Sequence, residues 1–137
     1  MRIVLDTNVL VAGQLNPYGR CGDVVRLVFD GRVTLLVDAR ITAEYAEVLA
    51  RPRFGFDPAA VRVLLDFIDS TAEVTAAVPL TVWPPDRDDE PFLEVAAAGH
   101  ADALVTGNAA HFPAASVGAV TVLAPAAFVD CFAGRTS

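Results

Sequence analysis

The sequence predicts a three-layer α/β/α fold in which helices cover both faces of a mainly parallel sheet. Short uninterrupted runs of aliphatic and β-branched residues are typical of parallel strands buried on both faces. These runs alternate along the chain with stretches whose apolar residues recur at helical spacing, which indicates an α/β arrangement. The chain has 137 residues, of which 54% are hydrophobic, enough for one core of ordinary size. We therefore expect a single domain that spans residues 1–137.

The first half of the chain predicts two strands separated and followed by helices. The apolar runs place strands at residues 2–5 and 33–37. Apolar residues at helical spacing place the helices at residues 8–13, 23–30, 41–49 and from residue 58 onward. Pro52 and Gly55 follow the third of these helices and are expected to end it.

The second half continues the alternation. Residues 74–78 predict a weak strand, and the acidic segment with Pro91 is typical of the first turn of a helix. This helix is expected at residues 86–98. Buried strands follow at residues 103–106 and 120–123, and a last helix follows at residues 126–132. Gly99 ends the helix that starts in the acidic segment.

The composition excludes several classes of α/β enzyme. All ten basic residues are arginine, so the chain has no P-loop lysine, no Schiff-base lysine and no lysine of a phosphoacceptor receiver domain. Cys21 and Cys131 lie far apart, and without an export signal they are expected to be reduced thiols. No G-x-S-x-G turn is present, and His100 and His111 are expected on the surface or in loops. These features leave hydrolysis by a triad without support.

The apolar runs are too short for a membrane helix, which needs roughly 20 apolar residues. The first apolar run is interrupted at once by Asp6 and Asn8, unlike the middle of a signal peptide. We therefore expect a cytoplasmic protein without membrane association.

The formal net charge is −7. An acidic surface argues against sequence-independent capture of nucleic acid, which normally rests on basic residues. Cations held by grouped carboxylates would reverse the local potential that a phosphate meets. The charge alone therefore neither supports nor excludes a nuclease.

Asp6 is expected at the carboxyl end of the first strand, where functional groups of open α/β sheets gather. Its alternative role is to cap the helix that starts near Asn8. A strand-end aspartate on its own does not distinguish a ligand from a cap, so further carboxylates at the same edge are needed.

Glu44 falls on the same helical stripe as the apolar residues Ile41, Tyr45 and Val48, whereas Glu47 falls on the opposite side. An ionised carboxylate on a core-facing stripe needs a cation, a cleft or a proton, because its burial without a partner costs several kcal/mol. A salt bridge to arginine remains the alternative to a metal.

Asp89 precedes Phe92, Leu93 and Ala96 by three, four and seven residues and is expected to share their inward face. By the same helical spacing, the inward face is not shared by Asp86, Asp88, Glu90 and Glu94. Capping of the helix by Asp88 or Asp89 is the alternative, and it does not exclude coordination.

Asp102 and Asn108 stand at opposite ends of the strand at residues 103–106. If that strand is parallel to the first, Asn108 lies at the edge of Asp6 and Asp102 lies about 13 Å away. We therefore place Asn108 at the site and give Asp102 a structural role. Thr106 could orient a bound water or a carboxylate, and the alternative is that it stands there only as a residue that favours strands.

Five segments together resemble the PIN-domain family over residues 2–130. They are VLDTNVLV, ITAEYAEVLAR, DRDDEPFLEVA, ADALVTGN and HFP. The resemblance implies an endoribonuclease dependent on Mg²⁺ or Mn²⁺, with metal ligation by Asp6, Glu44 and Asp89. The resemblance also carries a fourth position of the site, commonly aspartate in the family, onto Asn108. This sequence has an amide there, so the resemblance does not imply full occupancy of a second metal site. The chemistry agrees, because hard cations select oxygen ligands and acidify a bound water.

The variant resembles the toxin branch of toxin–antitoxin systems. This implies an RNA substrate, a small antitoxin that covers the acidic cleft, and a homodimer. A second hypothesis keeps the fold without the activity, as a catalytically degenerate binding or assembly module. It is motivated by Asn108 and by the acidic surface.

Overall fold

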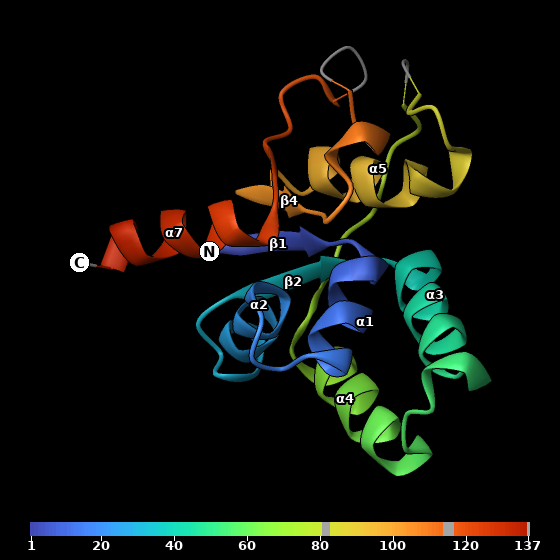
Figure 1. Cartoon of the computed structure of the whole chain (residues 1–137). Coiled ribbons are helices and arrows are strands. Elements are labelled where there is room, and N and C mark those ends of the chain that lie inside the picture. The colour runs from blue at the N-terminus through green and yellow to red at the C-terminus, as the bar shows by residue number, and fades with distance from the viewer. Residues whose placement is uncertain (81–82, 114–116, 137) are drawn as a thin grey trace.

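The computed structural model describes residues 1–80, 83–113 and 117–136 (Figure 1). The sheet consists of β1 (Arg2–Leu5), β2 (Thr34–Val37), β3 (Glu73–Val74), β4 (Ala103–Val105) and β5 (Val122–Leu123). The α-helices are α1 (Thr7–Leu15), α2 (Arg20–Phe29), α3 (Ala39–Leu49), α4 (Pro58–Thr71), α5 (Glu90–Ala98) and α7 (Pro125–Thr136). Three short 3₁₀ helices are η1 (Pro52–Phe54), η2 (Arg87–Asp89) and η3 (Ala109–His111).

All the strand pairs of the five-stranded sheet are parallel, in the order β3-β2-β1-β4-β5. The central strand β1 is buried on both sides, since Ile3 pairs with Leu35 of β2 and with Ala103 of β4. Its aliphatic side chains are almost completely buried, which is why its sequence does not alternate between apolar and polar residues. The predicted parallel sheet is confirmed.

The strand order reverses at β1. From β1 the chain moves outward through β2 to β3 and then returns to β4 and β5 on the other side. Such a reversal opens a crevice beyond the carboxyl ends of the two strands at which it occurs. In this chain those strands are β1 and β4, so the residues that follow Leu5 and Val105 lie at the crevice.

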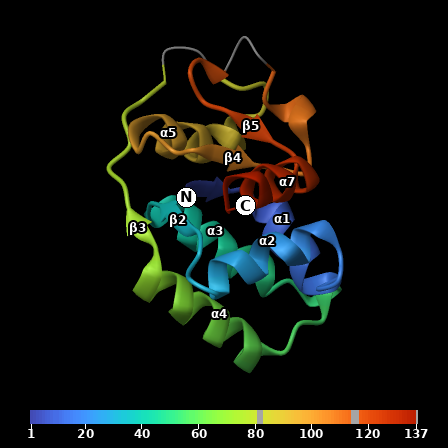
Figure 2. The ribbon, with the colours of Figure 1, turned by 90° about the vertical axis from the view of Figure 1, so that its left-hand side faces the viewer.

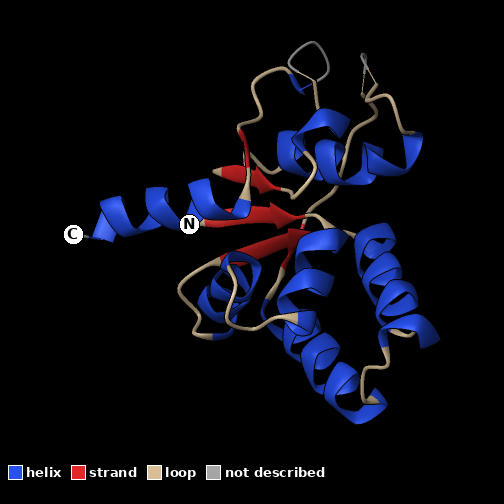
Figure 3. Ribbon diagram, in the orientation of Figure 1, coloured by secondary structure: helices blue, strands red, loops and turns tan. Residues whose placement is uncertain are grey.

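Helices cover both faces of the sheet, as predicted (Figures 2 and 3). Helix α5 packs on one face, in contact with β1, β2 and β4. Helices α1, α2 and α7 lie on the other face, where α2 contacts both of the others. Helices α3 and α4 pack against each other and against β2. No helix among the described residues has the length and apolarity needed to cross a membrane.

The predicted elements are all present, with shifted ends. The second helix begins at Arg20 rather than at residue 23, and the weak strand expected at residues 74–78 is reduced to Glu73–Val74. Helix α5 begins at Glu90, because the acidic segment before it forms the separate 3₁₀ turn η2. This turn determines where Asp86 and Asp89 lie.

Candidate active site

Asp6 follows β1 directly and is held in place by β4. Its backbone N–H donates to the Val105 carbonyl at 2.9 Å, and the Thr106 hydroxyl donates to Asp6 Oδ2 at 2.7 Å. Asp6 stands at the N-cap position of α1 but makes no side-chain capping hydrogen bond. It is 6% exposed. The hydrogen bond from Thr106 shows that this residue orients the Asp6 carboxylate.

Burial raises the pKa of Asp6. The hydrogen bond from Thr106 and the nearby amides of Asn8 and Thr7 partly offset this effect, because they stabilise the ionised form. The carboxylate therefore lies in an environment that a positive charge would relieve.

Glu44 projects from α3 toward the same crevice. The Asp38 carboxylate caps this helix by accepting from Ile41 N–H at 3.0 Å, which fixes the helix phase. Glu44 is half-buried, and the Thr7 hydroxyl donates to its Oε2. Glu47 is exposed and pairs with Arg51 one turn later. The two glutamates therefore lie on the predicted sides of α3.

Tyr45 joins α3 to the end of β1 beneath these carboxylates. Its side chain is fully buried, and its hydroxyl donates to the Leu5 carbonyl at 2.5 Å. Burial raises the pKa of Tyr45 well above its usual range, and the charges of Asp6 and Glu44 raise it further. The phenol therefore stays neutral, and its hydrogen bond fixes α3 relative to the end of β1, next to Asp6.

Asp89 closes η2 and precedes α5 without capping it. It is 8% exposed, and its Oδ2 atom is buried without a hydrogen bond among the described residues. That atom lies 3.3 Å from Nδ1 of His111, within ion-pair distance of the imidazole. Burial raises the pKa of Asp89 to about 6, and the charge of Asp6 is the next cause. The expected capping alternative is thus not realised, and the carboxylate faces the other acids.

The three predicted carboxylates line one open cleft of about 480 Å³ at the carboxyl ends of the strands. Asp86, His111, Arg51, Arg53 and Phe54 also line this cleft. The remaining lining residues are Thr7, Asn8, Val11, Ala12, Leu15 and Val48. The cleft thus combines four carboxylates with two arginines, an arrangement suited to a phosphate bridged to cations.

Asn108 lies at the same sheet edge as Asp6, as predicted, but it is not among the described residues that line this cleft. Its backbone N–H donates to the Thr106 hydroxyl at 3.1 Å, and its side-chain Nδ2 lies 2.9 Å from Nε2 of His111. At the opposite edge, Asp102 accepts from the backbone N–H of Arg2 at 2.8 Å. The structural role expected for Asp102 is thus confirmed.

One expectation about side-chain placement is wrong. Glu94 is 8% exposed instead of facing away from the core, and it pairs with Arg40 of α3. Asp86 is exposed, as its helical spacing predicted, but it also lines the cleft from the 3₁₀ turn before α5. His111 is exposed in η3, as expected, and it too lines the cleft. The HFP segment was the only sequence signal for His111.

The donor set of this cleft suits a hard divalent cation. Its side chains offer carboxylate oxygens, which Mg²⁺ and Mn²⁺ prefer, and the buried unpartnered oxygen of Asp89 is a group that an ion would satisfy. Within residues 1–80, 83–113 and 117–136, however, no three His, Cys, Asp or Glu side chains stand close enough to hold one ion.

A comparison with protein families shows to which family the chain belongs. The PIN domain profile matches residues 2–110. This chain belongs to the PIN domain family, whose members are generally nucleases that use divalent metals. Neither the comparison with curated proteins nor the comparison with solved structures found a match.

Proposed function

We propose that this chain is a divalent-metal-dependent endoribonuclease and the toxin component of a type II toxin–antitoxin system. The observation that carries the proposal is the convergence of Asp6, Glu44 and Asp89 from three different elements on one cleft of a PIN domain. Such a convergence of acids, of which Asp6 and Asp89 are buried, is unfavourable without a counter-ion, so its presence favours a cation-dependent function.

Asp6, Glu44 and Asp89 would hold Mg²⁺ or Mn²⁺. The bound ion would supply an acidified water and stabilise charge on the phosphate and the leaving 3′ oxygen. The chain's own residues prepare this site. Thr106 orients the Asp6 carboxylate and Thr7 holds the Glu44 carboxylate. Asn108 is assigned a supporting role at the same edge.

Arg51 and Arg53 have a different task in this proposal. Both line the cleft, and guanidinium groups bind phosphate oxygens in a planar, two-pronged geometry. They would position the RNA backbone beside the acidic residues of the cleft, which a chain with net charge −7 cannot achieve by overall attraction.

The proposed partners follow from the surface. An acidic chain suits a basic antitoxin segment that covers the cleft. We also propose a homodimer, as the resemblance to the toxin branch implies, and the apolar side chain of Val63 on α4, which is 66% exposed, is available to such a contact. We place this assembly in the cytoplasm and assign residues 1–137 to one domain.

A catalytically degenerate binding or assembly module is the second candidate. It is favoured by the amide at Asn108 and by the spacing of the described acids, which do not yet form a ligand set. The two candidates differ in whether the cleft binds and uses a metal.

Cleavage of RNA distinguishes them. Purified protein incubated with mixed single-stranded RNA and Mn²⁺ is expected to cut internally, and EDTA or the substitution Asp6→Asn is expected to abolish cutting. Equal cleavage in EDTA would contradict the metal-dependent mechanism. Absence of cleavage in Mn²⁺ and in Mg²⁺ would favour the module.

A further inference from the structure

Asn108 does not cap the short helix that follows it. It stands at the N-cap position of η3 but makes no side-chain capping hydrogen bond, although asparagine is among the residues preferred at that position for this purpose. Its side chain instead places Nδ2 at 2.9 Å from Nε2 of His111. The amide is therefore used for a contact with the imidazole.

The 3₁₀ turn brings these two side chains together. The backbone N–H of His111 donates to the Asn108 carbonyl at 3.1 Å and closes the turn. A 3₁₀ helix has about three residues per turn, so side chains at positions i and i+3 lie one above the other. The backbone thus sets the pairing of Asn108 with His111, even though the His111 side chain is 46% exposed.

The other ring nitrogen of His111 faces Asp89. Its Nδ1 atom lies 3.3 Å from Asp89 Oδ2, the buried carboxylate oxygen that makes no hydrogen bond within residues 1–80, 83–113 and 117–136. An ionised carboxylate accepts hydrogen bonds and donates none, so this contact is favourable when Nδ1 carries a proton. His111 is then a donor beside a buried oxygen that lacks one.

The Asn108 amide selects the same tautomer of the ring. A neutral imidazole carries a proton on one nitrogen and a lone pair on the other. The Nδ2 group of Asn108 can only donate, so its contact requires the lone pair on Nε2 and leaves the proton on Nδ1. The opposite tautomer would turn a lone pair toward the Asp89 carboxylate. Both neighbours of the ring therefore favour the Nδ1–H form.

Asn108 is also connected to the other buried acid of the cleft. Its backbone N–H donates to the Thr106 hydroxyl at 3.1 Å, and that hydroxyl donates its own proton to Asp6 Oδ2 at 2.7 Å. One residue thus reaches Asp6 through its backbone and Asp89 through its side chain. Partners of this kind hold metal ligands in one orientation, and their loss commonly costs about ten- to a hundredfold in metal affinity or activity.

We propose that Asn108 and His111 are positioning residues for the metal site. The Asn108 amide holds the imidazole in its Nδ1–H tautomer, and the Nδ1–H group fixes the Asp89 carboxylate at the cleft. The two oxygens of a carboxylate offer about four lone-pair sites, so a hydrogen bond at Oδ2 leaves others for a cation. An ionised aspartate at position 108 has no donor for this task. The inference rests on the proposed function, since it assigns partners to one of the three proposed ligands.

The tautomer can be measured in the metal-free protein. Long-range proton–nitrogen magnetic resonance spectra distinguish the tautomers of the chain's two histidines. At about pH 8.5, where imidazoles are ordinarily neutral, we expect the Nδ1–H form for His111. The exposed His100 is the internal control and should show the Nε2–H form that a free imidazole favours. Asn108→Asp replaces the donor by an acceptor and should place a proton on Nε2 of His111. Asn16→Asp adds the same charge at the end of α1 and should leave the tautomer unchanged.

Mn²⁺ affinity, measured by calorimetric titration, is the second readout. His111→Leu removes the donor and should weaken Mn²⁺ binding about tenfold, the lower end of the range for such partners. His111→Asn retains an N–H group near the position of Nδ1 and should recover part of the loss. A residue that only fills space would give the opposite order, because leucine is the larger side chain. His100→Asn is the matched control and should bind Mn²⁺ as wild type does, since asparagine suits the positive φ of 51° at that position.

Three results overturn the inference while the proposed function stands. The first is the Nε2–H tautomer for His111 in the wild-type protein, and the second is an unchanged tautomer in Asn108→Asp. The third is wild-type Mn²⁺ affinity in His111→Leu, with the fold shown intact by circular dichroism. If the wild-type protein binds no Mn²⁺, the proposed function fails, and the positioning role fails with it whichever tautomer is observed.

Discussion

Glu44 and Glu47 offer a comparison within one helix. They carry the same side chain three positions apart on α3, but Glu44 lines the cleft whereas Glu47 is exposed and pairs with Arg51. Glu44→Gln removes one carboxylate from the proposed metal site, and we expect it to lower the cleavage rate at least about a hundredfold, as loss of a group that stabilises transition-state charge does. Glu47→Gln is the control, because its amide oxygen can still accept a hydrogen bond from Arg51, and it should change the rate less than about twofold. A larger loss with Glu47→Gln would show that the acidic side of α3 is assigned to the wrong residue.

Asp89 predicts a pH dependence of the metal-free protein. Its folded pKa of about 6 lies above the ordinary value of 3.8, so the folded chain holds this proton more tightly than the unfolded chain. The raised pKa therefore makes stability fall as the pH rises from about 4 to about 6, and the loss is complete above that window. Asp89→Asn has no such penalty. With EDTA present, we expect this variant to be more stable than wild type at pH 7.5 by about 1 to 2 kcal/mol, allowing for solvent screening in the open cleft.

Denaturant unfolding at several pH values measures this difference. It should become small near pH 4 and vanish below about pH 3, where the folded and the unfolded wild-type chain both hold the proton. A constant difference across the pH range would mean that the carboxylate is not destabilised by ionisation in the folded state.

The placement of some of these side chains could be predicted from the sequence, and that of others could not. Glu44 could be placed because a regular helix converts spacing into direction, and Asp6 because a strand end is defined by its apolar run. Asp86 could not be placed, since a 3₁₀ turn changes the phase just before α5. His111 reaches the cleft from η3, and no periodic pattern governs the direction of a side chain in such a short turn.

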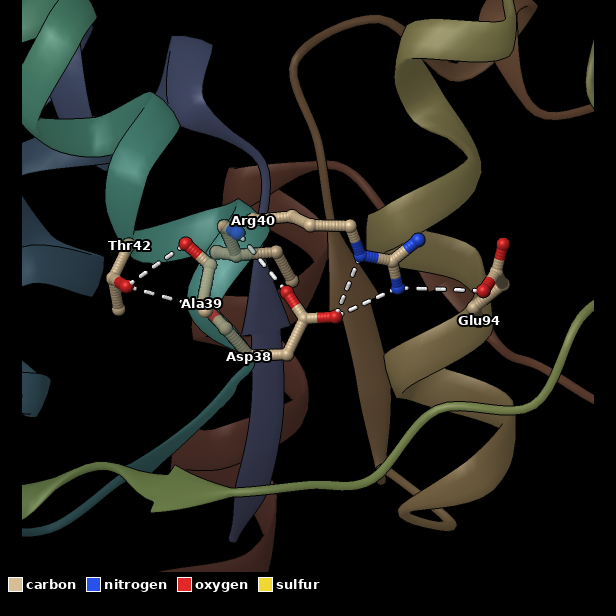
Figure 4. A network of polar contacts seen from close by, with 6 residues as sticks. Asp38, Ala39, Arg40, Thr42 and Glu94 are labelled. Carbon is tan, nitrogen blue, oxygen red and sulfur yellow. Dashed lines mark hydrogen bonds and ion pairs between the residues drawn. The ribbon is translucent and has the colours of Figure 1, made fainter.

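At the scale of elements, an ion-pair network joins the first turn of α3 to the middle of α5 (Figure 4). The Arg40 guanidinium donates to Asp38 Oδ2 at 2.7 Å and to Glu94 Oε2 at 3.3 Å. Asp38 also caps α3, so one carboxylate fixes both the helix start and the arginine. Because α3 carries Glu44 and α5 follows Asp89, this network sets the relative position of two cleft acids.

Arg40→Met tests the network. It leaves the mostly buried Glu94 without its cation, and we expect a loss of about 1 to 2 kcal/mol in the free energy of unfolding, moderated by the partial exposure of Arg40. Arg20→Met removes an exposed arginine that lies 3.6 Å from Asp23 and should cost less than about 0.5 kcal/mol. Equal effects of the two substitutions would mean that the network contributes no more than a surface pair.

The order of elements could be read from the sequence, but their ends and contacts could not. The strand predicted at residues 74–78 is limited to Glu73–Val74, where an edge strand pairs with β2 alone. The burial of Glu94 depends on α3 lying beside α5, which is a tertiary contact between segments far apart in the chain. Periodicity within one helix carries no information about such a neighbour.

At the scale of the whole molecule, the parallel sheet with its reversal at β1 explains why the acids meet. The carboxyl ends of β1 and β4 lie side by side, and the helices that start beyond them bring further side chains to the same edge. The acids converge despite their mutual repulsion because the packed core fixes the elements that carry them. A divalent cation that binds only the folded chain should therefore stabilise the whole fold by linkage.

Calorimetric titration of the metal-free protein with Mn²⁺ tests the central claim most directly, since it measures the proposed metal site without any assumption about the RNA. Asp102→Asn is the matched control, because it alters an aspartate at the opposite edge of the sheet. We predict that wild type and Asp102→Asn bind Mn²⁺ with similar affinity and that Asp6→Asn binds it at least about tenfold more weakly, as affinity for hard cations grows with carboxylate count. Equal Mn²⁺ affinity of wild type and Asp6→Asn, or no binding by wild type, would contradict the account.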